Sequence, residues 1–135
     1  MSVKLKAGVL GAGHLGKIHL RLLHQSEKYE LVGFFDESLE VQQQITAAFG
    51  FWAFPTAQAL IEAVDVVDIV TPTLYHYDLA KLAISSGKHV FLEKPITKTV
   101  AQAQELIDLA NKHKVLGQVG HVERFNPAFL AVKDH

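Results

Sequence analysis

The sequence contains no cysteine, which excludes disulfide bonds and thiolate metal ligands. It also lacks an excess of either charge, since 13 lysines and arginines face 14 aspartates and glutamates, so no basic surplus favours nucleic acid. No apolar run approaches the roughly 20 residues of a membrane-spanning helix, and the N-terminus has no signal-peptide core. The histidines are dispersed. These absences predict a cytoplasmic protein with no metal site, no nucleic-acid partner and no membrane partner.

Strand-like and helix-like patterns alternate along the 135 residues, which are enough for one domain with a buried core. This alternation predicts an α/β fold, with a doubly wound, mainly parallel sheet of about six strands and helices on both faces. The expected strands are residues 3–10, 31–36, 51–54, 65–71, 88–93 and 115–119. The expected helices are residues 14–25, 38–49, 56–63, 74–86 (with Thr73 as the N-cap) and 100–113 (with Thr99 as the N-cap).

A glycine-rich turn joins the first expected strand to the first expected helix. Gly11 permits a tight turn, Gly13 lets a pyrophosphate approach the backbone, and Gly16 lets the helix pack near the strand. The N-terminus of the helix offers free N–H groups to the phosphates. The expected pyrophosphate site comprises Gly11, Ala12, Gly13, His14, Leu15 and Gly16. A structural turn without a ligand, another nucleotide or S-adenosylmethionine are the alternatives at this point.

Asp36 lies 20 residues after Gly16, at the end of the second expected strand. Its carboxylate is placed to accept hydrogen bonds from the adenosine ribose hydroxyls and to repel a 2′-phosphate. The next residues, Glu37 and Ser38, supply no cation. The sequence therefore predicts NAD as the cofactor, with NADP possible because Ser38 tolerates a phosphate.

The sequence Glu93-Lys94-Pro95 ends the fifth expected strand. Pro95 keeps Lys94 out of the α-region, and the carboxyl ends of parallel strands face the ligand crevice. Partial burial there lowers the pKa of a lysine, which could then exchange a proton with a substrate hydroxyl as a hydride leaves the carbon. Glu93 could accept hydrogen bonds from ribose hydroxyls. The alternative is a solvated lysine at the end of a strand.

Four motifs follow one another in the chain: the glycine turn, residues 70–76 (VTPTLYH), residues 93–95 (EKP) and residues 120–127 (GHVERFNP). In this order they resemble the N-terminal half of the Gfo/Idh/MocA oxidoreductases. The resemblance implies a Rossmann fold, with a dinucleotide-binding domain over residues 1–120. It also implies that residues 121–135 cross toward a C-terminal substrate domain absent from this chain. The activity implied is hydride transfer between nicotinamide and a hydroxyl carbon of a sugar, cyclitol or sugar nucleotide.

The resemblance also assigns roles to individual residues. Lys94 matches the catalytic lysine, the proton donor and acceptor. Thr71, Pro72, His76, Glu93 and Pro95 match cofactor-contacting positions, with His76 near the nicotinamide half and Pro95 at a proline that is often cis in relatives. Arg124 and Asn126 are the expected substrate residues, in a segment similar to that of members acting on nucleotide-linked amino sugars. From the residues alone, His76 is equally a surface or capping histidine, and Arg124 an ion-pair partner.

The expected behaviour follows from these assignments. The chain alone should bind a dinucleotide but catalyse poorly, and the full-length protein should form a homo-oligomer that acts on a small molecule. Three alternatives remain: an inactive dinucleotide-sensing regulator, a reductase similar to biliverdin reductase, and a methyltransferase, for which Lys94 has no purpose.

Overall fold

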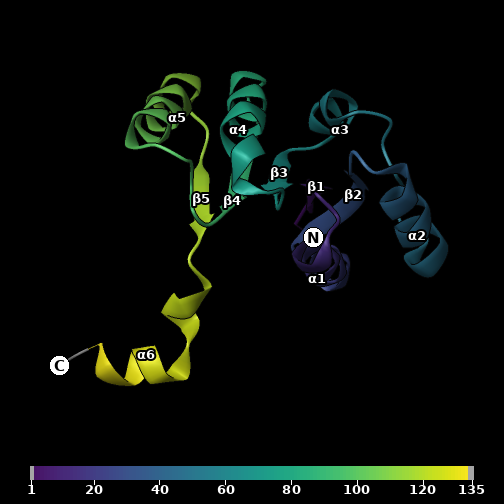
Figure 1. Cartoon of the computed structure of the whole chain (residues 1–135), viewed down its shortest axis with the longest axis horizontal. Coiled ribbons are helices and arrows are strands. Elements are labelled where there is room, and N and C mark those ends of the chain that lie inside the picture. Colours follow the sequence, from purple (N-terminus) through teal and green to yellow (C-terminus); the bar gives the residue numbers. More distant parts are fainter. Residues whose placement is uncertain (1, 134–135) are drawn as a thin grey trace.

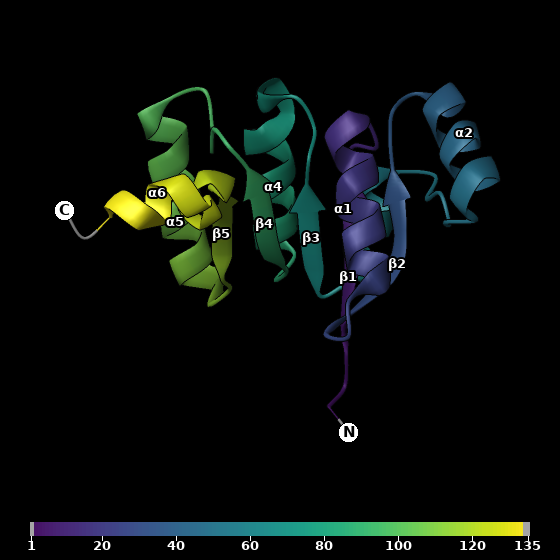
Figure 2. The ribbon, with the colours of Figure 1, turned by 90° about the horizontal axis from the view of Figure 1, so that it is seen from below.

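Short apolar segments form one parallel sheet, in the order β2-β1-β3-β4-β5. The computed structural model describes residues 2–133. The strands are β1 (Leu5–Leu10), β2 (Tyr29–Phe35), β3 (Val66–Ile69), β4 (His89–Glu93) and β5 (Gly117–Gly120). Figure 2 shows the strands running in the same direction, so their carboxyl ends share one edge. The strand order reverses between β1 and β3, where sheets of this kind form their ligand crevice.

Helices cover both faces of the sheet (Figure 1). They are α1 (His14–Gln25), α2 (Leu39–Phe49), α3 (Ala57–Ala63), α4 (His76–Ser85), α5 (Val100–His113) and α6 (Pro127–Val132). One face carries α1 and α2, the other carries α3, α4 and α5, and α6 extends away from the sheet. Among residues 2–133, no helix is long and apolar enough to cross a membrane.

Alternation along the strands divides the buried residues into two cores. In β1, Val9 packs in the core under α1 and α2, while its neighbour Leu10 packs in the core under α3, α4 and α5. In β3, Val67 and Ile69 both face the second core. The side chain between them, Asp68, therefore points to the α1 face, where a charged residue in a buried strand needs a partner.

The sheet has five strands rather than the six that the pattern predicts. Residues 51–54 lie beside β2 but form only one bridge, between Phe34 and Ala53. The Phe34 N–H donates to Trp52, and the Phe54 N–H donates back to Phe34. Pro55 follows at once, and because it has no N–H to donate, the pairing stops there.

The fourth helix starts later than predicted. Residues Thr73–Tyr75 form a separate 3-10 turn, closed by a hydrogen bond from the Tyr75 N–H to the Pro72 carbonyl, and α4 begins at His76. Thr73 is therefore not the N-cap of α4. The N-cap predicted at Thr99 is confirmed, since its hydroxyl accepts a hydrogen bond from the Gln102 N–H.

Candidate functional site

A pocket of about 600 Å³ opens at the carboxyl ends of β1, β2 and β3. The glycine turn, the end of β2 and the turn after β3 line it together. The predicted cofactor residues that line this pocket are Gly11, Gly13, His14, Leu15, Asp36, Thr71 and Pro72. Segments that are far apart in the sequence thus meet at the crevice that the strand order predicts.

The three glycines of the turn have different environments. Gly11 has a φ of +94°, and a Cβ there would lie 2.9 Å from the backbone of Val70 and Thr71. A Cβ on Gly16 would overlap the carbonyl oxygen of Gly11, so α1 lies directly against the strand exit. A Cβ on Gly13 would have no atom within 4 Å, so this glycine faces open space at the start of α1. The turn is therefore tightly packed at Gly11 and Gly16, against the backbone of the protein, and open to a ligand at Gly13.

These features fit a dinucleotide. No side chain caps the N-terminus of α1, so its first N–H groups remain available to phosphate oxygens. The hydroxyl oxygen of Thr71 is buried and has no hydrogen-bond partner among residues 2–133. A buried polar atom at the wall of a pocket is suited to a polar ligand group.

Asp36 connects the end of β2 to the glycine turn. Its Oδ2 accepts a hydrogen bond of 2.9 Å from the Ala12 N–H, and its Oδ1 accepts one of 2.9 Å from the Ser38 N–H. Ala12 itself is buried behind the pocket wall, and its amide serves Asp36. Within the described part of the chain, the pocket has the carboxylates of Asp36, Glu37 and Asp78 but no lysine or arginine. This lining favours a ribose diol over a 2′-phosphate.

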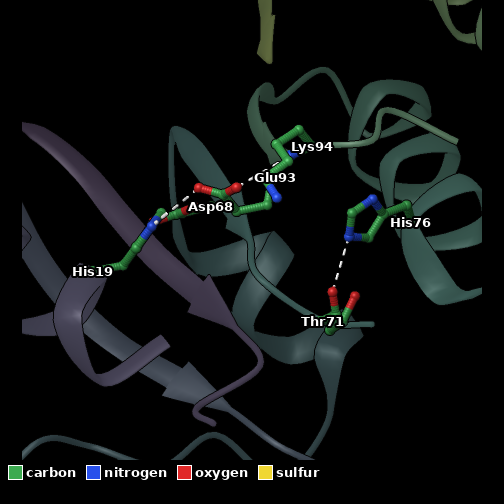
Figure 3. Close-up of polar contacts among 6 residues, drawn as sticks. All are labelled: His19, Asp68, Thr71, His76, Glu93 and Lys94. Carbon is green, nitrogen blue, oxygen red and sulfur yellow. Dashed lines mark hydrogen bonds and ion pairs between the residues drawn. The ribbon is translucent and has the colours of Figure 1, made fainter. Parts of the chain in front are cut away.

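His76 lies behind the cofactor edge rather than on it. It is buried in the first turn of α4 and does not line the pocket. Its Nε2 lies 2.9 Å from the Thr71 carbonyl oxygen (Figure 3). Its Nδ1 lies 2.9 Å from the Pro95 carbonyl oxygen. The ring therefore braces the turn after β3 against the turn after β4. Because both contacts are with backbone atoms, the sequence held no signal for them.

Lys94 lies at the tip of the turn after β4, and the peptide bond to Pro95 is cis, as the resemblance suggested. The partial burial predicted for Lys94 is not found. The side chain is exposed, because no described element covers the tip of this turn. Among residues 2–133, no hydrogen bond or ion pair engages its ammonium group. The amine is therefore free to meet a ligand.

Glu93 turns away from the dinucleotide pocket. Its Oε1 lies 3.4 Å from the His19 Nε2, and its Oε2 accepts a 3.2 Å hydrogen bond from the Lys94 N–H. The His19 Nδ1 is bonded to the Asp68 Oδ2 at 2.8 Å. His19 and Asp68 are not among the predicted site residues, although an aspartate inside an apolar strand is a usable signal. No group of three or more His, Asp or Glu residues is arranged to hold a metal ion in the described part of the chain.

The predicted substrate residues lie apart from the pocket. Arg124 is exposed, in the 3-10 turn Val122–Phe125 that follows β5. It forms no ion pair with any described residue, so the alternative of a bracing pair is not found either. Asn126 serves as the N-cap of α6, with its Oδ1 accepting from the Ala128 N–H and its Nδ2 donating to Glu123. Neither residue lines the dinucleotide pocket.

Comparison with known proteins finds a matching oxidoreductase family and several related dehydrogenases. Residues 5–121 match the Gfo/Idh/MocA model, described as an oxidoreductase family with an NAD-binding Rossmann fold. The chain is 37% identical over 130 residues to UDP-N-acetylglucosamine 3-dehydrogenase of Acidithiobacillus ferrooxidans, covering 93% of this chain and 40% of that protein. It is 32% identical over 131 residues to inositol 2-dehydrogenase of Rhizobium meliloti, covering 96% of this chain and 39% of that protein.

Solved structures show the same fold. The structure of the Acidithiobacillus ferrooxidans enzyme has a TM-score of 0.90 and 34% identity, over 98% of this chain and 44% of that one. Biliverdin reductase of Synechocystis sp. PCC 6803, solved with biliverdin and NADP+, has a TM-score of 0.90 and 28% identity, over 97% of this chain and 42% of that one. The chain spans about two fifths of the length of the curated relatives it matches.

Proposed function

Because the chain belongs to the Gfo/Idh/MocA family of oxidoreductases and is an NAD-binding Rossmann domain, we propose that it serves a dehydrogenase acting on a hydroxyl carbon. The substrate proposed is a sugar, cyclitol or sugar nucleotide. The observation that carries the proposal is the pocket itself, which is lined both by the open face of Gly13 and by the anchored carboxylate of Asp36. NAD supplies the hydride acceptor when it is bound.

Different residues of the chain bind the cofactor and transfer the proton. The glycine turn and the first N–H groups of α1 hold the pyrophosphate, and Asp36 holds the adenosine ribose. Oxidation of an alcohol also requires removal of the hydroxyl proton. We assign that proton to the Nζ of Lys94, which accepts it in the oxidation and returns it in the reverse direction. The lack of a competing partner among the described residues supports this role. Because the amine accepts a proton only in its neutral form, the role also requires that Lys94, exposed here, become buried when substrate is bound.

Two observations favour this function over the alternatives. The biliverdin reductase was solved in complex with NADP+, whereas the pocket here is lined by three carboxylates and, among the described residues, no lysine or arginine. Lys94 stands at the end of β4 with its amine free, and a module that only senses the dinucleotide has no use for such a group. Similarity to a UDP-N-acetylglucosamine 3-dehydrogenase supports a nucleotide-linked amino sugar, with the exposed Arg124 available to its phosphates.

We propose that residues 1–120 bind the cofactor and that residues 121–135, of which 134 and 135 lie outside the described residues, lead toward a substrate domain. The greater length of the relatives supports this division. A cytoplasmic location and a homo-oligomeric assembly are part of the same proposal. Cell fractionation tests the first, and light scattering tests the second.

Calorimetric titration with NAD and NADP tests the cofactor assignment. We expect NAD to bind at least about tenfold more tightly than NADP. Asp36→Ala should weaken NAD binding by about tenfold to a hundredfold, because one charge-assisted hydrogen bond is worth roughly 1.5–3 kcal/mol. Asp65→Ala is the matched control, since its carboxylate also accepts a backbone N–H, from Lys6, but at the opposite edge of the sheet. It should leave the affinity unchanged. Tighter binding of NADP would refute the view that the carboxylates of the pocket exclude a 2′-phosphate. If neither cofactor bound, the glycine turn would have only a structural role.

A further inference from the structure

Three titratable side chains from three elements meet on the α1 face of the sheet, outside the dinucleotide pocket (Figure 3). His19 comes from α1, Asp68 from β3 and Glu93 from β4. The imidazole lies between the two carboxylates, with its Nδ1 2.8 Å from Asp68 and its Nε2 3.4 Å from Glu93. Each ring nitrogen therefore faces a carboxylate oxygen.

The sheet dictates this meeting. Asp68 pairs with Phe91 in the register of β3 and β4, so Glu93 projects on the same face as Asp68, one strand over and two residues further. Glu93 pairs with Gly120 of β5. A Cβ on Gly120 would lie 2.9 Å from the Glu93 Oε1, so the glycine leaves the space that this carboxylate fills. The position of Glu93 is thus set from both sides.

The arrangement favours a doubly protonated imidazole. An ionised carboxylate only accepts hydrogen bonds, so a neutral ring with one N–H can satisfy one of the two contacts, and the imidazolium satisfies both. The hydrogen bond with Asp68 raises the pKa of His19, although burial opposes that shift. Burial raises the pKa of Asp68. The Asp68 Oδ1 is buried without a partner in the described part of the chain, so His19 is its one described countercharge.

The three side chains of His19, Asp68 and Glu93 are linked to the Lys94 turn by a hydrogen bond to the backbone. The Glu93 Oε2 accepts a hydrogen bond from the Lys94 N–H, which extends the series of contacts from Asp68 through His19 and Glu93 to Lys94. The cluster of these three side chains lines a groove of about 800 Å³, separate from the dinucleotide pocket. The other titratable or charged groups that line this groove are Tyr29 of β2 and, after β5, His121 and Arg124. Within residues 2–133, only Asp68 and Glu93 form a hydrogen bond or ion pair with His19.

We propose that His19 is a positioning residue for the dehydrogenase reaction: as an imidazolium it holds the Glu93 carboxylate, and through it the backbone at Lys94, in place against α1. The helix that presents its N-terminus to the phosphates is thereby tied to the turn that presents the amine. The role of these contacts in catalysis rests on the proposed function. The contacts themselves, from His19 through Glu93 to the Lys94 amide, do not depend on it.

The direction of the pH dependence follows. Below the raised pKa of His19 the ring donates to both carboxylates, and as the pH rises through that pKa it loses one N–H. The ring then keeps the shorter contact, with Asp68, and releases Glu93. The hydrogen bond to the Lys94 amide loses its support at the same pH. A histidine that merely packed α1 against β3 would leave that amide unaffected.

NMR titration of the whole chain over about pH 5 to 9 tests the tie. We expect the His19 ring to titrate above its usual pKa of about 6.5, and the Lys94 amide to shift with the same midpoint. His19→Gln keeps one amide donor and should abolish the pH step at Lys94. His24→Gln is the matched control, because it makes the same change on the same helix at a residue whose described contact is with the Phe51 ring. It should leave both titrations unchanged.

A second variant keeps the test decisive if His19→Gln does not fold. Glu93→Ala should leave the titration of His19 in place, because the Asp68 contact remains, while the pH step at Lys94 disappears. A Lys94 amide that is flat through the titration of His19, or that keeps its step in either variant, would overturn the proposal.

Addition of NAD separates this proposal from the proposed function. If both hold, NAD shifts the amides of the glycine turn equally in the wild-type chain and in His19→Gln, but shifts the Lys94 amide less in the variant. Equal shifts at Lys94 would refute positioning by His19. Absence of any shift at the glycine turn would refute the cofactor assignment, and the pH titration would still decide the role of His19.

Discussion

Gly16→Ala should destabilise the chain by about 3 kcal/mol and abolish dinucleotide binding, the largest effect expected of any single methyl group here. The added Cβ would overlap the carbonyl oxygen of Gly11 and lie 2.9 Å from its carbonyl carbon. Both are backbone atoms, so no side chain can rotate to make room. Helix α1 would have to move away from the exit of β1, which would separate its N–H groups from the turn. Urea denaturation measures the stability, and calorimetry with NAD measures the binding.

Gly13→Ala is the matched control, three residues earlier in the same turn. A Cβ at this position would meet no atom within 4 Å, and the backbone φ of −67° suits alanine. We therefore expect the stability to change by less than about 1 kcal/mol. The affinity for NAD should nevertheless fall at least about tenfold, because the methyl group occupies the approach of the pyrophosphate. If both variants were equally stable, the close packing of α1 against the turn would not be the reason for Gly16.

In a catalytically active protein that contains this domain, Lys94→Met should lower kcat by about 100-fold to 10,000-fold. The affinity for NAD should change by less than about twofold. The variant keeps the length of the side chain and removes only the group that exchanges the proton. Formation of reduced nicotinamide measures turnover, with inositol and UDP-N-acetylglucosamine as trial substrates. Both are named for relatives of this chain.

Lys98→Met provides the control for Lys94. Lys98 is exposed, as Lys94 is, and lies four residues further along the same connection to α5. Its replacement should leave both kcat and the NAD affinity unchanged. Full activity in Lys94→Met would remove Lys94 from the role of proton acceptor, and equal losses in both variants would indicate a general electrostatic effect of the loop.

The parts of the site that could be predicted depend on short-range patterns. The glycine turn, Asp36 and the strand ends follow from periodicity and from the placement of ligands at the carboxyl edge of a parallel sheet. The prediction that NAD is preferred to NADP used only the residues beside Asp36, and the structure adds the carboxylate of Asp78 from α4 to the same pocket. Each of these features is determined within one βα unit, so the local sequence carries it.

The parts that could not be predicted depend on contacts across the sheet. His19 lies 49 residues from Asp68 in the chain, and they meet only because α1 packs over the face to which β3 turns that carboxylate. The ring nitrogens of His76 contact backbone carbonyl oxygens, which every residue possesses. The identity of its partners therefore cannot be predicted from the pattern of side chains. Residues 51–54 have the composition of a strand, but Pro55 prevents the pairing from continuing.

The hydrogen bond between Asp36 and Ala12 has a consequence for engineering the cofactor preference. The carboxylate that would have to be removed to admit a 2′-phosphate also anchors the backbone of the glycine turn. A cation introduced at this position would leave the buried Ala12 amide without an acceptor. A switch to NADP therefore requires two coupled changes: a group that binds the 2′-phosphate, and a new hydrogen-bond acceptor for the Ala12 N–H. Each change alone should weaken the binding of both cofactors.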